Sequence, residues 1–79
     1  MDITIYTKPD CPYCIKAKQF LNNKNLPYSE KVLGIDIASD SFVNKYQTTV
    51  PVILMANNLI GGYDQMLILY SVSPELFVG

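Results

Sequence analysis

This chain has no histidine and no arginine, and only two of its 79 residues are cysteines. The absence of histidine excludes Ser–His–Asp and Cys–His catalysis and every histidine-ligated zinc or iron site. Two cysteines can neither form a disulfide framework nor supply four thiolates to a metal within one chain. The longest apolar runs, such as 66–70, are far shorter than the roughly 18 residues of a membrane-spanning helix, so no membrane contact is expected.

Composition and charge indicate one small globular domain. Hydrophobic residues make up 49% of the chain and charged residues 16%, which excludes a disordered tail, a collagen-like array and a coiled coil. At 79 residues we expect a single domain over 1–79. Six lysines against seven acidic residues give a net charge of −1, without the clustered cations that hold a nucleic-acid backbone. No nucleic-acid partner is therefore expected.

The first residues indicate where the chain resides. Met1 to Ile3 lack the basic start and the long apolar segment of a secretory signal. We therefore expect a cytoplasmic chain, in which thiols stay reduced.

Periodicity and turn residues predict alternating strands and helices. Proline suits the first turn of a helix, so a helix beginning at Pro12 makes Cys11 the expected N-cap. Asn25 suits a left-handed helix end, and Pro27 prevents that helix from resuming. The continuous apolar run 52–55 predicts a strand buried on both faces. The predicted strands cover 3–6, 28–33, 52–55 and 59–60, and the predicted helices cover 12–24, 39–47 and 66–70.

Local signals mark the ends of these elements. Ser39 or Asp40 is expected to cap the second helix and Asp64 the third, and Asn57-Asn58 is expected to form a hairpin turn. The run 73–75 interrupts the last helix, which leaves either one broken helix or two short ones. The order β-α-β-α-β-β-α predicts an α/β sandwich.

The sequence Cys11-Pro12-Tyr13-Cys14 is the main chemical signal. Two intervening residues place Cys14 one helical turn after Cys11, close enough for a disulfide. At the N-cap, unpaired N–H groups and the helix dipole favour a thiolate on Cys11, and Lys8 is a further candidate cation. Cys14, inside the helix and facing the core, is expected to stay a thiol. The pair is therefore expected to act as a nucleophile, Cys11, and a resolving cysteine, Cys14.

The same spacing has less specific interpretations. It occurs in half of a zinc or iron–sulfur site, and two core cysteines can share it by chance. The position after a strand and at a helix start, in a short α/β chain, favours a thioredoxin-like redox pair.

Three segments together resemble the motifs of glutaredoxins. The segment from Tyr6 to Cys14 resembles the active-site segment of that family, Thr49-Val50-Pro51 its second motif, and Gly61-Gly62-Tyr63-Asp64 its third. They occur in the family's order and with similar spacings, over nearly the whole chain. The resemblance implies a thioredoxin-like fold, with a four-stranded mixed sheet flanked by helices.

The resemblance also implies a glutathione site. It implies a cis bond before Pro51, which leaves the backbone of Val50 open to the cysteinyl part of glutathione like an added strand. It places the γ-glutamyl carboxylate on the N–H groups of Tyr63 and Asp64, after Gly62, and the ammonium group on the Asp64 carboxylate. Without the resemblance, 49–51 is an ordinary loop and 61–64 a strand end followed by a helix cap.

The remaining implied contacts surround the other end of the ligand. Lys8 is expected to meet the glycine carboxylate, with Gln47, or Lys45 in compensation, beside it, and Tyr13 to cover the bound thiol. Thr49 of the second motif is also an expected glutathione-binding residue. Many relatives have an arginine near the position of Gln47, and a neutral amide holds a carboxylate less strongly. Gln65 stands where many relatives have a second polar or acidic residue. Without the resemblance, Lys8 is a solvated lysine and Tyr13 an exposed aromatic.

The implied function is a glutathione-dependent thiol–disulfide oxidoreductase that uses Cys11 and Cys14. Glutathione is the expected reducing co-substrate, and no metal is expected. The expected partners are proteins with disulfides or glutathione mixed disulfides, ribonucleotide reductase among the candidates. The protein is expected to be a monomer.

Three alternatives remain open. One is a glutaredoxin-like redoxin recharged by thioredoxin reductase, an electron donor of ribonucleotide reductase. Another is an iron–sulfur carrier, in which two chains each contribute Cys11 and two glutathiones complete the ligands; Pro12 argues against it. The third is a peptide-binding module with inert cysteines.

Overall fold

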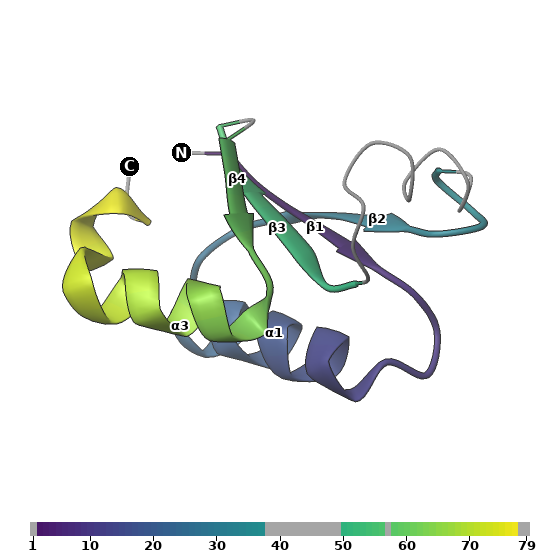
Figure 1. Ribbon diagram of the computed structural model, residues 1–79, viewed down its shortest axis with the longest axis horizontal. Coiled ribbons are helices and arrows are strands. Elements are labelled where there is room, and N and C mark those ends of the chain that lie inside the picture. Colours follow the sequence, from purple (N-terminus) through teal and green to yellow (C-terminus); the bar gives the residue numbers. More distant parts are fainter. Residues whose placement is uncertain (1, 38–49, 57, 78–79) are drawn as a thin grey trace.

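The computed structural model describes residues 2–37, 50–56 and 58–77, and their strands form one mixed sheet (Figure 1). The strand order is β2-β1-β3-β4. β1 runs parallel to β2 and antiparallel to β3, and β3 pairs antiparallel with β4. The strand bounds are β1 Ile3–Thr7, β2 Ser29–Val32, β3 Val52–Met55 and β4 Asn58–Gly61. The predicted four-stranded mixed sheet is confirmed.

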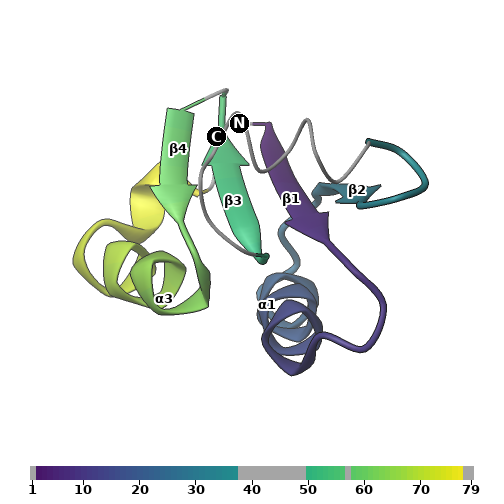
Figure 2. The ribbon, with the colours of Figure 1, turned by 45° about the vertical axis from the view of Figure 1, so that its right-hand side comes forward.

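Two helices lie on one face of this sheet, and both begin at the same end of it (Figures 1 and 2). Helix α1 covers Pro12–Asn23 and connects the parallel strands β1 and β2, a connection that requires a crossover. Helix α3 covers Tyr63–Val72 and follows β4. The helix predicted over 39–47 lies outside the described residues. Among the residues that the structure describes, no helix is long and apolar enough to span a membrane.

Helix α1 follows its sequence signals closely. Cys11 is the N-cap, with extended φ and ψ of −108° and 103°, and Pro12 opens the first turn. Asn25 takes the expected left-handed conformation, with φ 57°, and the N–H of Leu26 donates to the Leu21 carbonyl at 2.9 Å. The buried face consists of Cys14, Ala17 and Leu21.

The core lies between these helices and the two central strands. Along β1, alternation points Ile3, Ile5 and Thr7 inward. All four residues of β3 are buried, as the continuous apolar run predicted, because β3 is a central strand. Ile3, Ile5, Ala17, Leu21, Leu26, Ile53, Met55, Met66 and Phe77 form the main cluster.

The hairpin between β3 and β4 differs from the prediction. Met55 pairs with Asn58, so Asn58 begins β4 instead of forming the turn. The left-handed residue is Ala56, with φ 51°, and Asn57 lies outside the described residues. Pairing with β3 sets this register, and local turn propensity does not.

The start of α3 also differs from the prediction. Gly62, not Asp64, is the N-cap, and its N–H donates to the Gln65 side-chain oxygen at 3.0 Å. Just before it, Gly61 has φ 129°, and a Cβ there would lie 2.9 Å from Cγ of Gln65. Gly61 therefore needs both the conformational freedom and the small size of glycine.

After α3 the chain makes a short 3₁₀ turn, η1, Pro74–Leu76. The predicted interruption at 73–75 is thus resolved as a helix followed by a 3₁₀ turn. Phe77 is buried and meets Tyr70 edge-on at 5.1 Å between ring centroids, and Tyr70 meets Phe20 at 5.2 Å. These rings attach the end of the chain to α1.

One polar network crosses from the sheet to α1. Thr7 is the only buried polar or charged residue among those described, and its hydroxyl donates to the Glu30 carboxylate at 2.6 Å. The Lys18 ammonium lies 3.0 Å from the same oxygen. The Thr7 hydrogen bond first, and then Lys18, lower the pKa of Glu30 below its ordinary value of 4.5.

We expect Glu30→Gln to lower the free energy of unfolding by about 0.5–1 kcal/mol at neutral pH. The pKa of this carboxyl is depressed in the folded state, so its stabilisation is present above the ordinary value of 4.5. It is lost as the pH falls through the lowered value. Urea denaturation across the acidic range measures this, with the exposed Glu75→Gln as control. A difference between Glu30→Gln and the unaltered protein that persists unchanged into strong acid would contradict this account.

We expect Gly61→Ala to lower the free energy of unfolding by about 2–3 kcal/mol, because it combines a positive φ with a contact against Gln65. Gly34→Ala is the matched control. Gly34 also has a positive φ, 84°, but a Cβ there meets nothing within 4 Å, so about 1 kcal/mol is expected. Equal losses in the two variants, measured by urea denaturation, would show that the Gln65 contact is unimportant.

Candidate functional site

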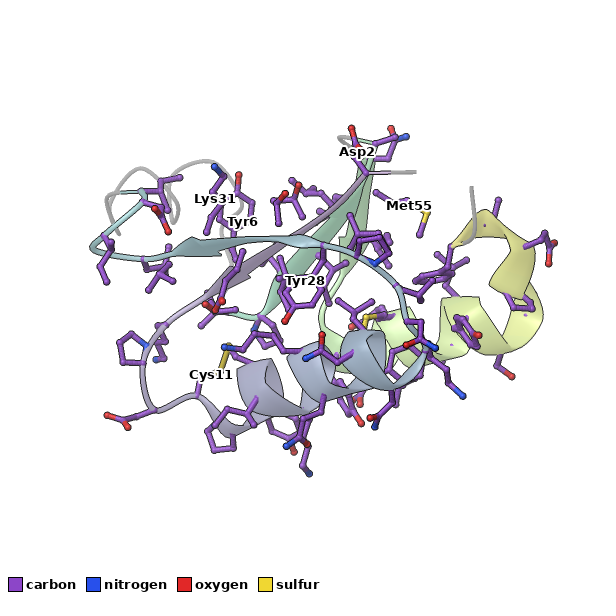
Figure 3. All side chains as sticks on the ribbon, turned by 180° about the vertical axis from the view of Figure 1, so that it is seen from behind. Asp2, Tyr6, Cys11, Tyr28, Lys31 and Met55 are labelled. Carbon is purple, nitrogen blue, oxygen red and sulfur yellow. A yellow bond between two sulfur atoms is a disulfide. The ribbon has the colours of Figure 1, made fainter. Side chains whose placement is uncertain are left out.

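The two cysteines lie at the first turn of α1 and are joined by a disulfide (Figure 3). Their Cα atoms are 5.2 Å apart. The N–H of Cys14 donates to Sγ of Cys11 at 3.2 Å, so this sulfur satisfies one of the N–H groups that a helix start leaves unpaired. When the disulfide is reduced, the same hydrogen bond and the helix dipole favour a thiolate on Cys11.

Apolar side chains surround the pair. Cys11 is 6% exposed and Cys14 only 1%. Val50 and Val52 complete the buried cluster, and partly buried side chains pack against it, namely Tyr6, Leu33 and Ile37. Water therefore reaches Cys11 at its edge and hardly reaches Cys14 at all. This is the asymmetry that the nucleophile and the resolving cysteine require.

The segment that precedes β3 lies against the cysteines. The Val50–Pro51 peptide bond is cis, as the resemblance implied. The Val50 side chain packs in the cysteine cluster. Gln47 and Thr49 of the predicted site lie outside the described residues.

A hollow of about 270 Å³ opens beside Tyr13, the residue that precedes Cys14. Four of the predicted ligand-binding residues lie along it or at its rim, from three separate segments. Its lining consists of Tyr13, Pro51, Tyr63, Asp64 and Gln65. The Tyr13 and Tyr63 rings lie 6.1 Å apart between centroids, and Tyr13 is 57% exposed, so its ring forms a wall open to solvent.

Charge in this hollow comes from the start of α3. Tyr63 and Asp64 occupy the first turn, whose N–H groups have no partner within the helix. The Asp64 carboxylate is exposed beside them. The site therefore offers donors to an anion and a carboxylate to a cation within one turn. The Gly62 N–H is already used by Gln65, so Gly62 serves as the cap and not as a donor to a ligand.

Two further features bear on the predicted site. Lys8 follows β1 and is exposed. Lys16 lies over the Tyr13 ring, with Nζ 5.2 Å from its centroid, and so places a cation beside one wall of the hollow. Among the described residues, no group of three or more His, Cys, Asp or Glu side chains is placed to hold a metal ion.

The sequence analysis missed the roles of Gln65 and of the Tyr63 ring. Gln65 was noted only as a departure from relatives, yet it caps α3 and lines the hollow. A signal for the cap was present, because glutamine three residues after an N-cap is typical of a capping box. The position of the Tyr63 ring had no local signal, since it depends on how α3 packs beside α1.

Known proteins resemble this chain over most of its length. The family model named Glutaredoxin matches residues 3–60. Glutaredoxin 3 of Escherichia coli is 36% identical over 67 residues, covering 82% of this chain and 81% of the relative. Hybrid peroxiredoxin hyPrx5 of Haemophilus influenzae is 46% identical over 66 residues, covering 81% of this chain. This chain spans only 27% of the length of that hybrid protein.

Solved structures agree with the fold. A solution structure of glutaredoxin from Brucella melitensis superposes with a TM-score of 0.78 and 25% identity, covering 98% of this chain and 88% of the other. Buckwheat glutaredoxin in complex with glutathione gives a TM-score of 0.77 at 19% identity, covering 96% and 76%. The thioredoxin-like fold is confirmed. With a family match over more than half of its length and a cysteine pair at the start of α1, the chain belongs to the glutaredoxin family of thiol–disulfide oxidoreductases.

Proposed function

We propose that the protein is a dithiol glutaredoxin that uses glutathione as its reductant. The observation that carries the proposal is the hollow beside Tyr13, the neighbour of Cys14, which has the N–H groups and the carboxylate of α3 at its rim. The α-carboxylate and ammonium of a γ-glutamyl group match these two features. Buckwheat glutaredoxin, which has a similar fold, was solved with glutathione bound, and this supports the same ligand here.

The proposed reaction is two successive exchanges at sulfur. The Cys11 thiolate attacks one sulfur of a substrate disulfide, forming a mixed disulfide and releasing the other sulfur as a thiolate, which takes up a proton. The Cys14 thiol loses its proton and attacks Cys11, which releases the reduced substrate and leaves the Cys11–Cys14 disulfide. Two electrons pass from the dithiol to the substrate.

Glutathione then reduces the Cys11–Cys14 disulfide back to the dithiol. One glutathione thiolate attacks the Cys11 sulfur, forms a mixed disulfide with it and releases Cys14 as a thiol. A second glutathione thiolate then attacks the glutathione sulfur of that mixed disulfide, which forms oxidised glutathione and releases Cys11 as a thiolate. In the first step the ring of Tyr13 covers the bound sulfur, while the start of α3 holds the γ-glutamyl group. Lys8 is proposed to meet the glycine carboxylate, and Gln47 and Thr49 are proposed as further glutathione-binding residues.

For the substrates we propose proteins with exposed disulfides or glutathione mixed disulfides. The relative called hybrid peroxiredoxin makes a peroxiredoxin one candidate, and ribonucleotide reductase is another. The proposed setting is the reducing cytoplasm, and the proposed working form is a monomer.

The first experiment is turnover of a glutathionylated small disulfide, recycled by glutathione, glutathione reductase and NADPH. Cys11→Ser is expected to abolish turnover, because it removes the attacking sulfur. Cys14→Ser is expected to retain it on this substrate, because glutathione can release Cys11 directly, but to lose reduction of protein disulfides. Turnover retained by Cys11→Ser would contradict the assignment.

The same assay identifies the reductant. If glutathione does not support turnover but thioredoxin reductase reduces the Cys11–Cys14 disulfide, the protein is a redoxin of the alternative class.

Asp64→Asn tests the γ-glutamyl site. It keeps the size of the side chain and the N–H groups of α3 but removes the charge, so the KM for glutathione is expected to rise about tenfold, or about 1.4 kcal/mol. The kcat is expected to change little, because the cysteines are untouched. Glu75→Gln, which removes an exposed charge elsewhere, should leave the KM unchanged. Equal KM values for Asp64→Asn and the unaltered protein would place the glutathione elsewhere.

A further inference from the structure

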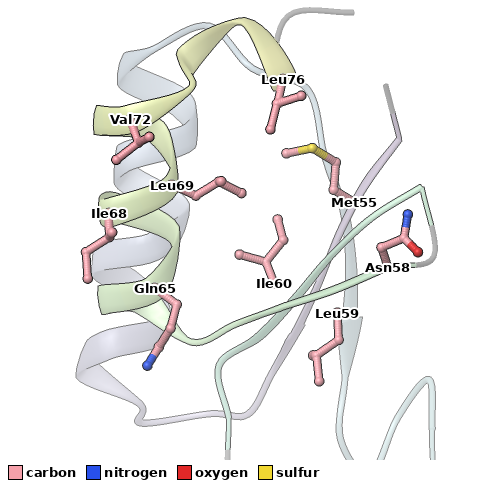
Figure 4. Close-up of a pocket in the computed structure, with 9 residues that line it drawn as sticks. All are labelled: Met55, Asn58, Leu59, Ile60, Gln65, Ile68, Leu69, Val72 and Leu76. Atoms are coloured by element: carbon pink, nitrogen blue, oxygen red, sulfur yellow. The ribbon is translucent and has the colours of Figure 1, made fainter.

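A second and larger hollow runs between β4 and α3, away from the cysteines (Figure 4). It encloses about 690 Å³. Apolar side chains form most of its wall, with two amides as the polar exceptions. The lining consists of Met55, Asn58, Leu59, Ile60, Gln65, Ile68, Leu69, Val72 and Leu76, and we call it the β4–α3 groove.

The groove exposes large apolar side chains that the fold does not cover. Leu59 is 57% exposed, Ile68 64% and Val72 74%. All three line the groove, one from β4 and two from α3. Figure 4 shows Leu69 and Ile60 pointing toward one another across it, with Leu76 pointing in from its far end. A contiguous exposed apolar patch on a small domain marks an interaction surface.

The backbone beside the groove is also available for binding. β4 is the last strand of the sheet order, and among the described residues no strand pairs with its outer edge. An edge strand presents unpaired N–H and C=O groups, onto which an extended peptide can add as a further strand. An apolar groove beside such an edge suits an extended chain whose alternate side chains are apolar.

The groove is continuous with the candidate active site. Gln65 lines both the β4–α3 groove and the hollow beside Tyr13. A chain leaving the hollow past Asp64 therefore enters the groove. The ten residues of α3 rise about 15 Å, and an extended chain advances about 3.3 Å per residue, so about five residues fill the groove.

The charges around the groove have one sign. No lysine or arginine occurs after Lys45 in the sequence. Asp64 lies at the end near the cysteines, and Glu75 precedes Leu76 at the other end. Asp2 is also at that far end, because its carbonyl accepts from Ala56, the neighbour of Met55. All three acidic residues are exposed.

Lys24 lies against α3 on the side of the helix that faces away from the groove. Lys24 lies 5.6 Å from the Tyr70 ring, which faces Phe20 and Phe77 and does not line the groove. A second copy of this chain would bring acidic residues against acidic residues. A partner with basic residues beside its apolar ones is therefore favoured.

We propose that the β4–α3 groove binds an extended, apolar segment of the disulfide-bearing protein substrate, with basic residues at its far end. The segment lies on the N-terminal side of the substrate's reacting cysteine. This direction rests on the proposed function, since the γ-glutamyl arm assigned to Asp64 precedes the cysteine of glutathione. The groove thus distinguishes protein substrates from small disulfides, while Cys11 and Cys14 perform the same exchange on both.

The test uses a nine-residue peptide with two lysines, four alternating valines and leucines, two glycines and a C-terminal cysteine. Its cysteine is in a mixed disulfide with thionitrobenzoate. The reduced protein, without glutathione, attacks the peptide sulfur through Cys11 and releases the coloured thiolate, and Cys14 then releases the peptide thiol. One matched peptide has serines and threonines in place of the valines and leucines, and another has glutamates in place of the lysines.

The apolar, basic peptide is expected to react about tenfold faster than the serine and threonine peptide at subsaturating concentration. The glutamate peptide is expected to be several-fold slower than the lysine peptide. Ile68→Ser combined with Val72→Ser should reduce the apolar preference below about twofold, and Leu59→Ser should reduce it partly. Ile35→Ser, which removes an isoleucine 78% exposed outside the groove, should leave the preference intact.

The mixed disulfide of free cysteine with thionitrobenzoate is the control substrate, because it reacts with Cys11 but cannot occupy the groove. All these variants should react with it at the unaltered rate, which also shows that they are folded. Loss of this reaction in the unaltered protein would overturn the Cys11 chemistry and this inference together. Normal reaction with it, but equal rates for the apolar and polar peptides, would overturn the inference alone. So would a dimer in sedimentation that Ile68→Ser with Val72→Ser converts to a monomer, because a second copy would then cover the groove.

Discussion

The start of α1 at Cys11 is the constraint on which the rest of the site depends. A helix start leaves N–H groups without partners, and here the Cys11 sulfur accepts one of them from Cys14 at 3.2 Å. The residue that caps the helix is therefore also the residue proposed as the nucleophile. The cap places Cys11 at the edge of the protein and Cys14 one turn inside it, 1% exposed. A change that moved the helix start by one residue would reverse or remove this asymmetry.

A second helix start converges on the same place. α1 and α3 both begin at the same end of the sheet, so Tyr13 and Tyr63 face each other across the hollow. In the proposed function, one helix start stabilises a thiolate on Cys11, and the other presents N–H groups and the Asp64 carboxylate to glutathione. The sheet holds the two helix starts at a fixed separation, because β1 leads into α1 and β4 leads into α3. The core therefore determines the spacing between the reacting sulfur and the ligand site.

Gln65 lies between the hollow beside Tyr13 and the β4–α3 groove. Its side chain accepts from the Gly62 N–H, packs against Gly61, and lines both hollows. Gly61 must be glycine because this side chain occupies the space that a Cβ would need. The same packing sets where the small-ligand hollow ends and where the β4–α3 groove begins. A short domain thus presents two adjoining surfaces along one helix.

The sequence by itself determined the local features. Cys11, Pro12 and Cys14 specified the helix start and the reactive pair, and the apolar run 52–55 specified a central strand, because cap chemistry and hydrophobic periodicity act over a few residues. The resemblance of three motifs identified the family. Only the tertiary structure decided the register that makes Asn58 a strand residue, the cap at Gly62, the Thr7–Glu30 hydrogen bond and the hollow that gathers Tyr13, Pro51 and Asp64. These depend on contacts between segments far apart in the chain, for which no local pattern carries a signal.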